Sequence, residues 1–260
     1  MAANLFTVLL PVHRPPALLP FAAASVLAQS EARFRLCILC DGAPPQTVEF
    51  ARVLAARDSR VEVFAFEKGE RYGEAHRHTI LSGADSDFVA QIGDDDLWLP
   101  DYLAEMARLL ETADFGNLPQ VSIRKNGMIH VASASLGDAR VRERMMTQRW
   151  NLFGPSFAGY RLAAYRRLPV GWSPAPPDIW TDLHMWRKFL AMREFRFETR
   201  FSFEAVKFAA ESRKAMTLAQ RAEEIRWYAE RFAVPADLRW FRAKARETLA
   251  FQRSIAGHAE

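Results

Sequence analysis

Residues 88–100 read FVAQIGDDDLWLP, an apolar run followed by three aspartates and a second apolar run. Its apolar beginning, FVAQI, predicts a buried strand. Three consecutive aspartates follow at positions 94–96, and adjacent carboxylates repel one another. We expect a divalent cation or a set of hydrogen bonds to offset this repulsion, with the first two aspartates at the cation. The third, Asp96, is expected to cap a helix that begins near Pro100, and a solvated acidic loop is the alternative for the whole cluster.

The chain before this stretch alternates between strand and helix patterns. Short apolar runs predict strands, and the segments between them have apolar residues at helical spacing. The predicted strands are residues 5–10, 36–40 and 61–66, and the predicted helices are residues 19–27, 48–55 and 74–83. Near-continuous apolar strands separated by helices are typical of a parallel sheet covered on both faces. We therefore expect an α/β fold with a mostly parallel sheet and flanking helices.

Polar residues follow three of these predicted strands. Residues 11–14 end the first strand at Pro11, Asp41 ends the second, and the aspartate triplet ends the fourth. In open sheets of this kind, ligands bind at the carboxyl ends of the strands. The three polar clusters therefore predict one binding site at one edge of the sheet.

The second half of the chain has a different pattern. An Asn-Gly pair within residues 121–131 predicts a hairpin with a type I′ turn. A helix is expected from about residue 178 or 181 to residue 192. Residues 217–232 and 237–255 predict two amphipathic helices divided at Pro235.

Composition and cysteine placement exclude several classes of protein. The 260 residues carry a formal net charge of only +4, which is too small to indicate nucleic-acid binding. Cys37 and Cys40 lie in a predicted strand, where the spacing places their side chains on opposite faces, so we interpret them as buried free thiols. No basic leader and no apolar run of about 18 residues is present. We expect a cytoplasmic protein.

Three motifs together resemble a known family. The stretches TVLLPVHR (7–14), CILCDG (37–42) and DDDLWLPD (94–101) are similar, in order and spacing, to segments of the family 2 inverting glycosyltransferases of the GT-A fold. The resemblance covers about residues 4–190. It implies a Rossmann-like GT-A sheet and transfer of a sugar from a nucleotide-diphosphate donor.

The resemblance also implies roles for the residues in these motifs. Asp41 is expected to accept a hydrogen bond from the nucleotide base, and Pro11 and His13 are expected to pack on that base. Asp94 and Asp95 are expected to lie against the nucleotide and its metal, Mn²⁺ or Mg²⁺, with Asp95 as the first choice for direct coordination. Cys40 and Gly93 stand where many members carry another aspartate.

Further site residues are expected outside these motifs. Arg71 and Arg77 are candidate phosphate or base contacts, and exposed cations on a helix are the alternative. Asp182, in the segment TDLHMW (181–186), resembles the family's general base, which takes the proton of the acceptor hydroxyl. An N-cap aspartate is the alternative there. Lys207 and Arg213 are expected in a mobile loop over the diphosphate.

The resemblance divides the chain into a GT-A domain, residues 1–215, and C-terminal amphipathic helices, residues 216–260. The domain is expected to have a nucleotide-binding half, about residues 1–110, and an acceptor half, residues 111–215. The basic C-terminal helices are expected to pack on the domain, to form a homodimer or to contact the inner face of a membrane.

The expected activity is inverting transfer from a nucleotide-diphosphate sugar, a UDP-sugar first, to a glycan, lipid-linked or protein acceptor in bacterial-type polysaccharide or glycoconjugate synthesis. One alternative is a non-catalytic nucleotide- or sugar-binding module that kept the fold. Another is a sugar-phosphate nucleotidyltransferase, although no glycine-rich loop follows the first strand. The same absence of a G-x-G-x-x-G sequence argues against a dehydrogenase.

Overall fold

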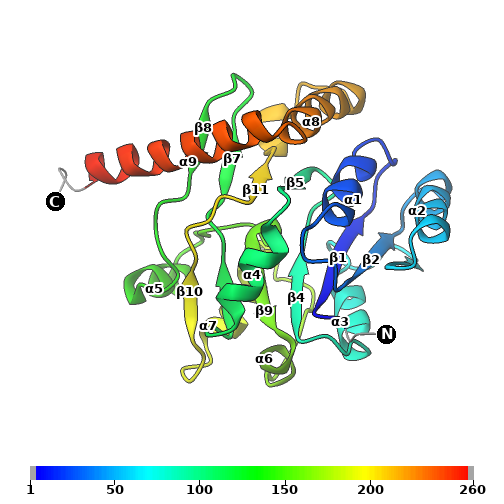
Figure 1. Cartoon of the computed structure of the whole chain (residues 1–260). Helices are drawn as coiled ribbons and strands as arrows, with labels where there is room; N and C mark the ends of the chain where they lie inside the picture. Colours follow the sequence, from blue (N-terminus) through cyan, green and yellow to red (C-terminus); the bar gives the residue numbers. More distant parts are fainter. Residues whose placement is uncertain (1–3, 257–260) are drawn as a thin grey trace.

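The computed structural model describes residues 4–256, and within them the larger sheet has seven strands. Their order across the sheet is β10-β6-β9-β4-β1-β2-β3 (Figure 1). The strands are β1 Phe6–Val12, β2 Phe34–Asp41, β3 Val61–Phe66, β4 Phe88–Gln91, β6 Phe115–Asn117, β9 Ala158–Arg161 and β10 Phe197–Thr199. Neighbouring strands are parallel except at β9, which is antiparallel to both β4 and β6. The mostly parallel α/β sheet predicted from the sequence is confirmed.

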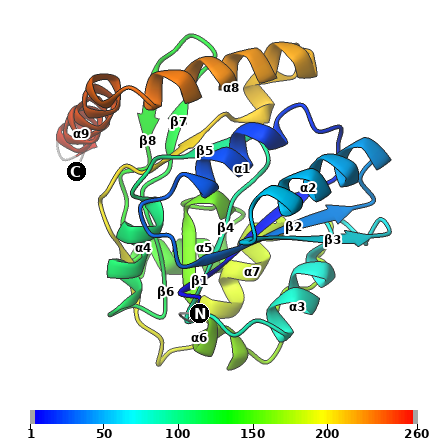
Figure 2. The same cartoon turned by 45° about the vertical axis from the view of Figure 1, so that its right-hand side comes forward.

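Helices cover both faces of this sheet. Figure 2 shows α2 on one side of strands β1 to β3 and α3 on the other. The helices along this part of the chain are α1 Leu19–Leu27, α2 Pro45–Arg57, α3 Glu74–Ser82, α4 Tyr102–Leu110, α5 Ala139–Thr147, α6 Leu162–Arg166 and α7 Thr181–Leu190. Strands covered on both faces have no need for polar side chains, and β2 is buried along nearly its whole length.

The first strand does not stop at Pro11, as the sequence predicted, but continues to Val12. Pro11 is in register with Leu39 of β2, whereas the pairing of β1 with β4 ends at Leu9. At Pro11 the strand therefore has a partner on one side only, and proline lacks a backbone N–H that the other side would need.

A smaller sheet lies beside the first and has the strand order β5-β11-β7-β8. Its strands are β5 Asp96–Trp98, β11 Ala205–Lys207, β7 Val121–Ile123 and β8 Ile129–Val131. The two C-terminal helices, α8 Leu218–Phe232 and α9 Pro235–Ala256, pack on this sheet (Figure 1). Ile225 and Phe241 from these helices share an apolar core with Val121 and Val206 from the strands. The predicted pair of C-terminal helices is confirmed, and they complete the core of the smaller sheet.

The hairpin at residues 121–131 is present, but the predicted type I′ turn is wrong. Gly127 has a φ of +79°, whereas Asn126 does not have a positive φ. The amide of Gly127 donates to the carbonyl of Arg124, and the amide of Arg124 donates to the carbonyl of Met128. A three-residue loop with glycine in the left-handed position therefore joins the strands.

Cys37 and Cys40 are both buried and free in β2, as expected from the sequence. Burial raises the pKa of Cys37 to about 12 and that of Cys40 to about 11. Both thiols therefore stay protonated at neutral pH and serve as small core residues. Among residues 4–256, no helix is long and apolar enough to cross a lipid bilayer.

Candidate active site

A cleft of about 920 Å³ lies at the carboxyl ends of β1, β2 and β4. Strand β1 lies between β2 and β4, so the chain winds outward from β1 in two directions. In open α/β sheets such a switch in strand order leaves a crevice for a ligand. Eight of the site residues predicted from the sequence line this cleft: Pro11, His13, Asp41, Arg71, Arg77, Asp94, Asp95 and Asp182.

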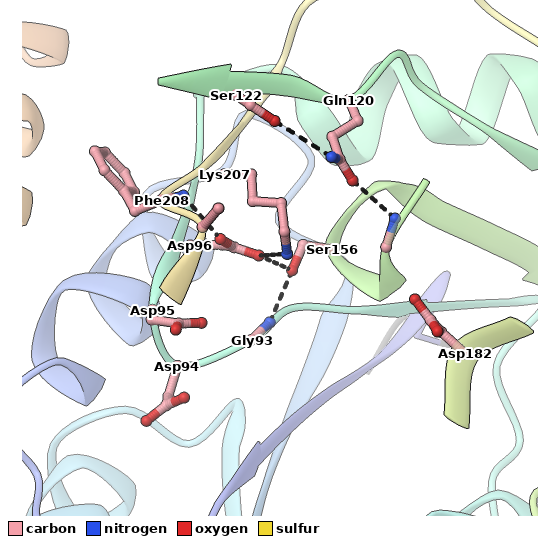
Figure 3. Close-up of polar contacts among 12 residues, drawn as sticks. Gly93, Asp94, Asp95, Asp96, Gln120, Ser122, Ser156, Asp182, Lys207 and Phe208 are labelled. Carbon is pink, nitrogen blue, oxygen red and sulfur yellow. Dashed lines mark hydrogen bonds and ion pairs between the residues drawn. The ribbon is translucent and has the colours of Figure 1, made fainter. Parts of the chain in front are cut away.

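The three consecutive aspartates point in different directions and have different partners (Figure 3). Asp94 pairs with Arg14 from the end of β1, at 2.9 Å. Asp95 pairs with Arg221 from α8, at 2.7 Å. Asp96 turns toward Ser156 and the smaller sheet. These partners offset the repulsion among the three carboxylates.

Asp94 is almost fully buried and keeps one oxygen without a hydrogen-bond partner. Its Oδ1 accepts from Arg14, while its Oδ2 is buried and unpartnered. Burial and the neighbouring charge of Asp95 raise the pKa of Asp94 to about 7, although Arg14 acts in the opposite direction. An orphaned carboxylate oxygen in a cleft is a place where a cation or a hydrogen-bond donor would be stabilised.

Asp96 belongs to β5, so the expected helix-capping role is wrong. The helix α4 begins at Tyr102, and its N-cap residue is Asp101. Asp96 Oδ2 accepts from the Ser156 hydroxyl at 2.6 Å, and Oδ1 accepts from the Phe208 amide at 3.2 Å. Burial raises the pKa of Asp96. Its hydrogen bonds make it a buried link between β5 and its neighbours, not a solvated acidic loop.

At the other end of the cleft, Asp41 holds the loop that precedes α3. Its Oδ1 accepts from the Gly69 amide at 2.6 Å, and its Oδ2 accepts from Lys68 Nζ at 2.7 Å. Gly73 has a φ of +67°, and a Cβ there would lie 2.6 Å from the Asp41 carboxyl carbon. Glycine at position 73 therefore lets the loop approach the carboxylate closely.

The two predicted arginines lie in this loop and in α3. Arg77 is buried, donates to the carbonyl of Tyr72 at 2.8 Å and lies over the ring of Trp172. Arg71 precedes the helix with a φ of +55° and donates to the carbonyl of Ile179 at 3.4 Å. The alternative that both are exposed cations on a helix is wrong, because Arg77 is buried and Arg71 is not on the helix.

Asp182 enters the cleft from the first turn of α7. The N-cap residue of this helix is Trp180, so the alternative of an N-cap aspartate is wrong. Asp182 Oδ2 accepts from Asn151 at 2.9 Å, and Oδ1 accepts from the Leu183 amide at 2.9 Å. Burial raises the pKa of Asp182. A fixed carboxylate with a raised pKa is suited to accept a proton.

Several residues of the cleft were not predicted in their observed positions. Lys207 ends β11 and faces both Asp96 and Asp182 (Figure 3), so it lies in a strand and not in a mobile loop. Arg213, expected in the same loop, is buried in a pair with Glu224 and does not reach the cleft. Arg14, Asn151 and Ser156, which line the cleft, and Arg221, which pairs with Asp95 beside it, were not singled out as site residues. Arg14 directly follows a predicted site residue, whereas the other three depend on contacts between distant segments.

Buried polar atoms without a partner concentrate in this cleft. Within the described part of the chain, nine buried side-chain nitrogen or oxygen atoms have no hydrogen-bond partner. Six of them belong to residues that line the cleft: Arg14, Arg71, Arg77, Gln91, Asp94 and Asn151. Because buried polar atoms are nearly always hydrogen-bonded, such a concentration indicates a site for a polar ligand.

The cleft fits a metal that arrives with its ligand. In residues 4–256, no group of three or more His, Cys, Asp or Glu side chains could hold a metal ion. Asp94 and Asp95 nevertheless offer carboxylate oxygens, which are the hard donors that Mg²⁺ and Mn²⁺ prefer. These ions are commonly held by one or two carboxylates, with phosphate oxygens and waters completing the coordination.

The sequence model of Glycosyl transferase family 2 matches residues 7–169, which is more than half of the chain. The chain belongs to glycosyl transferase family 2. This family of glycosyltransferase enzymes was the one that the three sequence motifs resembled. The assignment leaves nothing in favour of a sugar-phosphate nucleotidyltransferase.

One curated relative of this family 2 chain is the succinoglycan biosynthesis protein ExoW of Rhizobium meliloti (strain 1021). It is 34% identical over 99 residues, which are 37% of this chain and 31% of ExoW. The chain thus matches less than a third of that relative's length.

Solved structures show the same GT-A fold. TarS from S. aureus (residues 1–349) has a TM-score of 0.62 at 15% identity, over 80% of this chain and 61% of TarS. TarS in complex with UDP-GlcNAc has a TM-score of 0.60 at 17% identity, over 78% and 58% of the two chains. The mannosyltransferase PcManGT from Pyrobaculum calidifontis, with GDP-Man and Mn²⁺, has a TM-score of 0.58 at 20% identity, over 98% and 76%.

Proposed function

We propose that this family 2 protein is an inverting glycosyltransferase that moves one sugar from a nucleotide-diphosphate donor to an acceptor hydroxyl. The observation that carries the proposal is the shared cleft. Asp94 and Asp95 line it at the carboxyl end of β4, and Asp182 lines it from α7. Carboxylates suited to a metal-bound diphosphate and a carboxylate suited to proton transfer therefore face the same space.

The donor is proposed to lie along the carboxyl ends of β1, β2 and β4. Its nucleoside would contact Asp41, Pro11 and His13, and its diphosphate would lie beside Asp94 and Asp95. Arg71 and Arg77 add cations on the same side. We favour a UDP-sugar, because TarS, which has the same fold, has been solved with UDP-GlcNAc. A GDP-sugar is the alternative, because PcManGT has been solved with GDP-Man.

Asp182 is proposed as the general base. The acceptor oxygen forms a bond to the anomeric carbon as the bond from that carbon to the diphosphate oxygen breaks, and Asp182 takes the hydroxyl proton. A single displacement of this kind inverts the anomeric configuration. The hydrogen bond from Asn151 holds the Asp182 carboxylate in place. Burial raises the pKa of Asp182, which makes this carboxylate a stronger base.

The departing nucleotide gains negative charge as the sugar leaves. Bound Mn²⁺ or Mg²⁺ would supply Lewis-acid stabilisation of that charge. Asp95 is the proposed direct ligand, and the unpartnered Oδ2 of Asp94 lies beside it. Lys207, whose pKa is raised by Asp96, keeps a positive charge between the acidic residues of the cleft.

The acceptor is proposed to be a glycan in bacterial-type polysaccharide synthesis, with lipid-linked or protein acceptors as alternatives. The name of the relative ExoW, a succinoglycan biosynthesis protein, supports a polysaccharide. The C-terminal helices expose Trp227, Trp240 and Phe251, and Arg231 lies over the ring of Trp227. We propose that these helices contact a membrane surface or a second subunit, and that the protein is cytoplasmic, at the inner face of a membrane.

The test is release of nucleoside diphosphate from UDP-glucose, UDP-GlcNAc and GDP-mannose with Mn²⁺, with NMR of the product's anomeric configuration. We expect release from one donor, inversion at the anomeric carbon and loss of release in Asp182→Asn. A protein that binds a donor but releases nothing with any acceptor extract would support the non-catalytic alternative. Retention of configuration would contradict the inverting mechanism.

A further inference from the structure

We infer that Arg221, on the C-terminal helix α8, is a donor-binding residue that exchanges Asp95 for the diphosphate of the donor. The inference rests on the proposed function, since the donor supplies the anion. It goes beyond that function because it makes the C-terminal helices part of the donor site. Arg221 lies outside residues 7–169, the part that the family model matches.

The contact between Arg221 and Asp95 joins residues that are far apart in the chain. Arg221 Nη2 lies 2.7 Å from Asp95 Oδ2, and the arginine side chain is only 11% exposed. Its Nε is buried without a hydrogen-bond partner. One donor of this guanidinium is therefore unused, in a place where a second acceptor would be stabilised.

Helix α8 is fixed at this position by contacts around Arg221. Thr217 and Gln220 form a capping box at its start. Arg213 donates to Glu224 of the helix at 2.7 Å and to the carbonyl of Ile123 in β7 at 3.0 Å. These contacts hold the first turns of the helix against the smaller sheet, so the Arg221 side chain reaches the aspartates from a rigid element.

A second contact ties the same helix to the triplet. Tyr228 of α8 packs on the ring of Phe208, at 5.3 Å between centroids. The Phe208 amide donates to Asp96, the next residue after Asp95. The aspartate triplet is thus bound to α8 at two points, through Arg221 and through Phe208.

Charge explains why Arg221 would change partners. Arg14 and Arg221 both approach Asp95 Oδ2, at 3.7 and 2.7 Å. A carboxylate that shares its charge with a divalent cation holds a guanidinium less strongly. A diphosphate beside that cation offers several anionic oxygens, and the planar guanidinium matches them in two-point hydrogen bonds. Arg221 can therefore leave Asp95 for the diphosphate by a side-chain movement alone.

The test compares Arg221→Gln with Arg226→Gln by calorimetry on the full chain. Arg226 lies on the same helix, is exposed and pairs with Glu223, so it is a matched control. The probe is whichever of UDP, GDP and dTDP binds the native protein most tightly with Mn²⁺, beside its monophosphate. We expect Arg221→Gln to weaken diphosphate binding by about tenfold to a hundredfold and monophosphate binding by less than about threefold. Arg226→Gln should match the native protein.

Binding of Mn²⁺ alone tests the exchange itself. Removing the guanidinium frees Asp95, so Arg221→Gln should bind Mn²⁺ more tightly than the native protein does. Arg221→Lys keeps the positive charge and should retain more of the diphosphate affinity than Arg221→Gln does. If Arg221→Gln unfolds at a lower temperature than the native protein, Arg221→Lys is measured in its place.

Equal diphosphate affinity in the native protein and Arg221→Gln would overturn the inference while leaving the proposed function intact. Weaker Mn²⁺ binding in the variant would overturn the exchange. If none of the three nucleoside diphosphates binds the native protein, the proposed function fails and the inference fails with it.

Discussion

Lys207 and Asp96 are register partners across the antiparallel strands β11 and β5, and Lys207 Nζ lies 3.9 Å from Asp96 Oδ2. Asp96 is only 3% exposed, and it raises the pKa of Lys207. Both residues line the cleft, where Asp96 is buried and the Lys207 side chain is 31% exposed. Asp182 lines the same cleft and also raises the pKa of Lys207.

Asp96 should therefore matter for stability. Asp96→Ala leaves Lys207, the Ser156 hydroxyl and the Phe208 amide without their acceptor, and we expect it to lower the free energy of unfolding by about 3 kcal/mol. Asp96→Asn keeps an oxygen acceptor and should cost about 1 kcal/mol. Urea denaturation followed by circular dichroism measures both. Equal losses in the two variants would show that the acceptor role is unimportant.

Asp182 should matter for turnover and not for donor binding. Asp182→Asn keeps the shape of the side chain but cannot take a proton, so we expect kcat to fall by about 10²- to 10⁴-fold. Nucleoside diphosphate binding, measured by calorimetry, should change by less than about twofold. Turnover that survives the substitution would place the base elsewhere.

The pH dependence of kcat should report the buried base. Burial raises the pKa of Asp182, and the base works only when ionised. Activity should therefore fall as pH decreases, with a midpoint above the ordinary aspartate value of about 3.9.

Asn151 supplies the control for this assignment. Its hydrogen bond to Asp182 lowers the pKa of that carboxyl, so Asn151→Ala should move the midpoint of the acid limb to higher pH. A midpoint that stays in place or moves to lower pH would mean that the limb reports another group.

Gly73 should be needed for nucleoside binding. A Cβ at this position meets the Asp41 carboxylate, and the φ of +67° is unfavourable for other residues. We expect Gly73→Ala to displace Asp41 and to weaken binding of the nucleoside diphosphate by about tenfold or more. Gly83→Ala, at the other end of α3, has space for a methyl group and a negative φ, so it is the matched control. Equal affinities would remove Asp41 from the nucleoside site.

Much of the nucleotide half of the fold was predictable from local sequence. Strands β2 to β4 and helices α1 to α3 follow the apolar patterns closely, because buried parallel strands read as continuous apolar runs. The residues at their carboxyl ends were predictable too, since parallel strands bring those ends together. The end of the first strand was mispredicted at Pro11. Proline interrupts a strand only where a neighbouring strand would accept a hydrogen bond from the backbone N–H that proline lacks.

The predictions that were wrong or missing concern residues whose positions depend on contacts between distant segments. Asp96 looked like a helix cap, but three-residue β5 forms because β11, more than a hundred residues later, pairs with it. In the sequence, Arg221 is one of several cations on an amphipathic helix, and nothing marks it as a site residue. Its contact with Asp95 depends on how α8 packs. Asn151 likewise lies in no regular element, and only the fold brings it to Asp182. Local patterns cannot specify such pairings.

Thermal unfolding with UDP, GDP, dTDP and CMP, each with and without Mn²⁺, tests whether Asp95 holds a divalent metal on the donor diphosphate. One nucleoside diphosphate at about 100 times its Kd should raise the Tm of the native protein by about 5–10 °C only when Mn²⁺ is present. Asp95→Ala should abolish that increase while remaining folded. Absence of any metal-dependent increase in the native protein, or its persistence in Asp95→Ala, would contradict the claim.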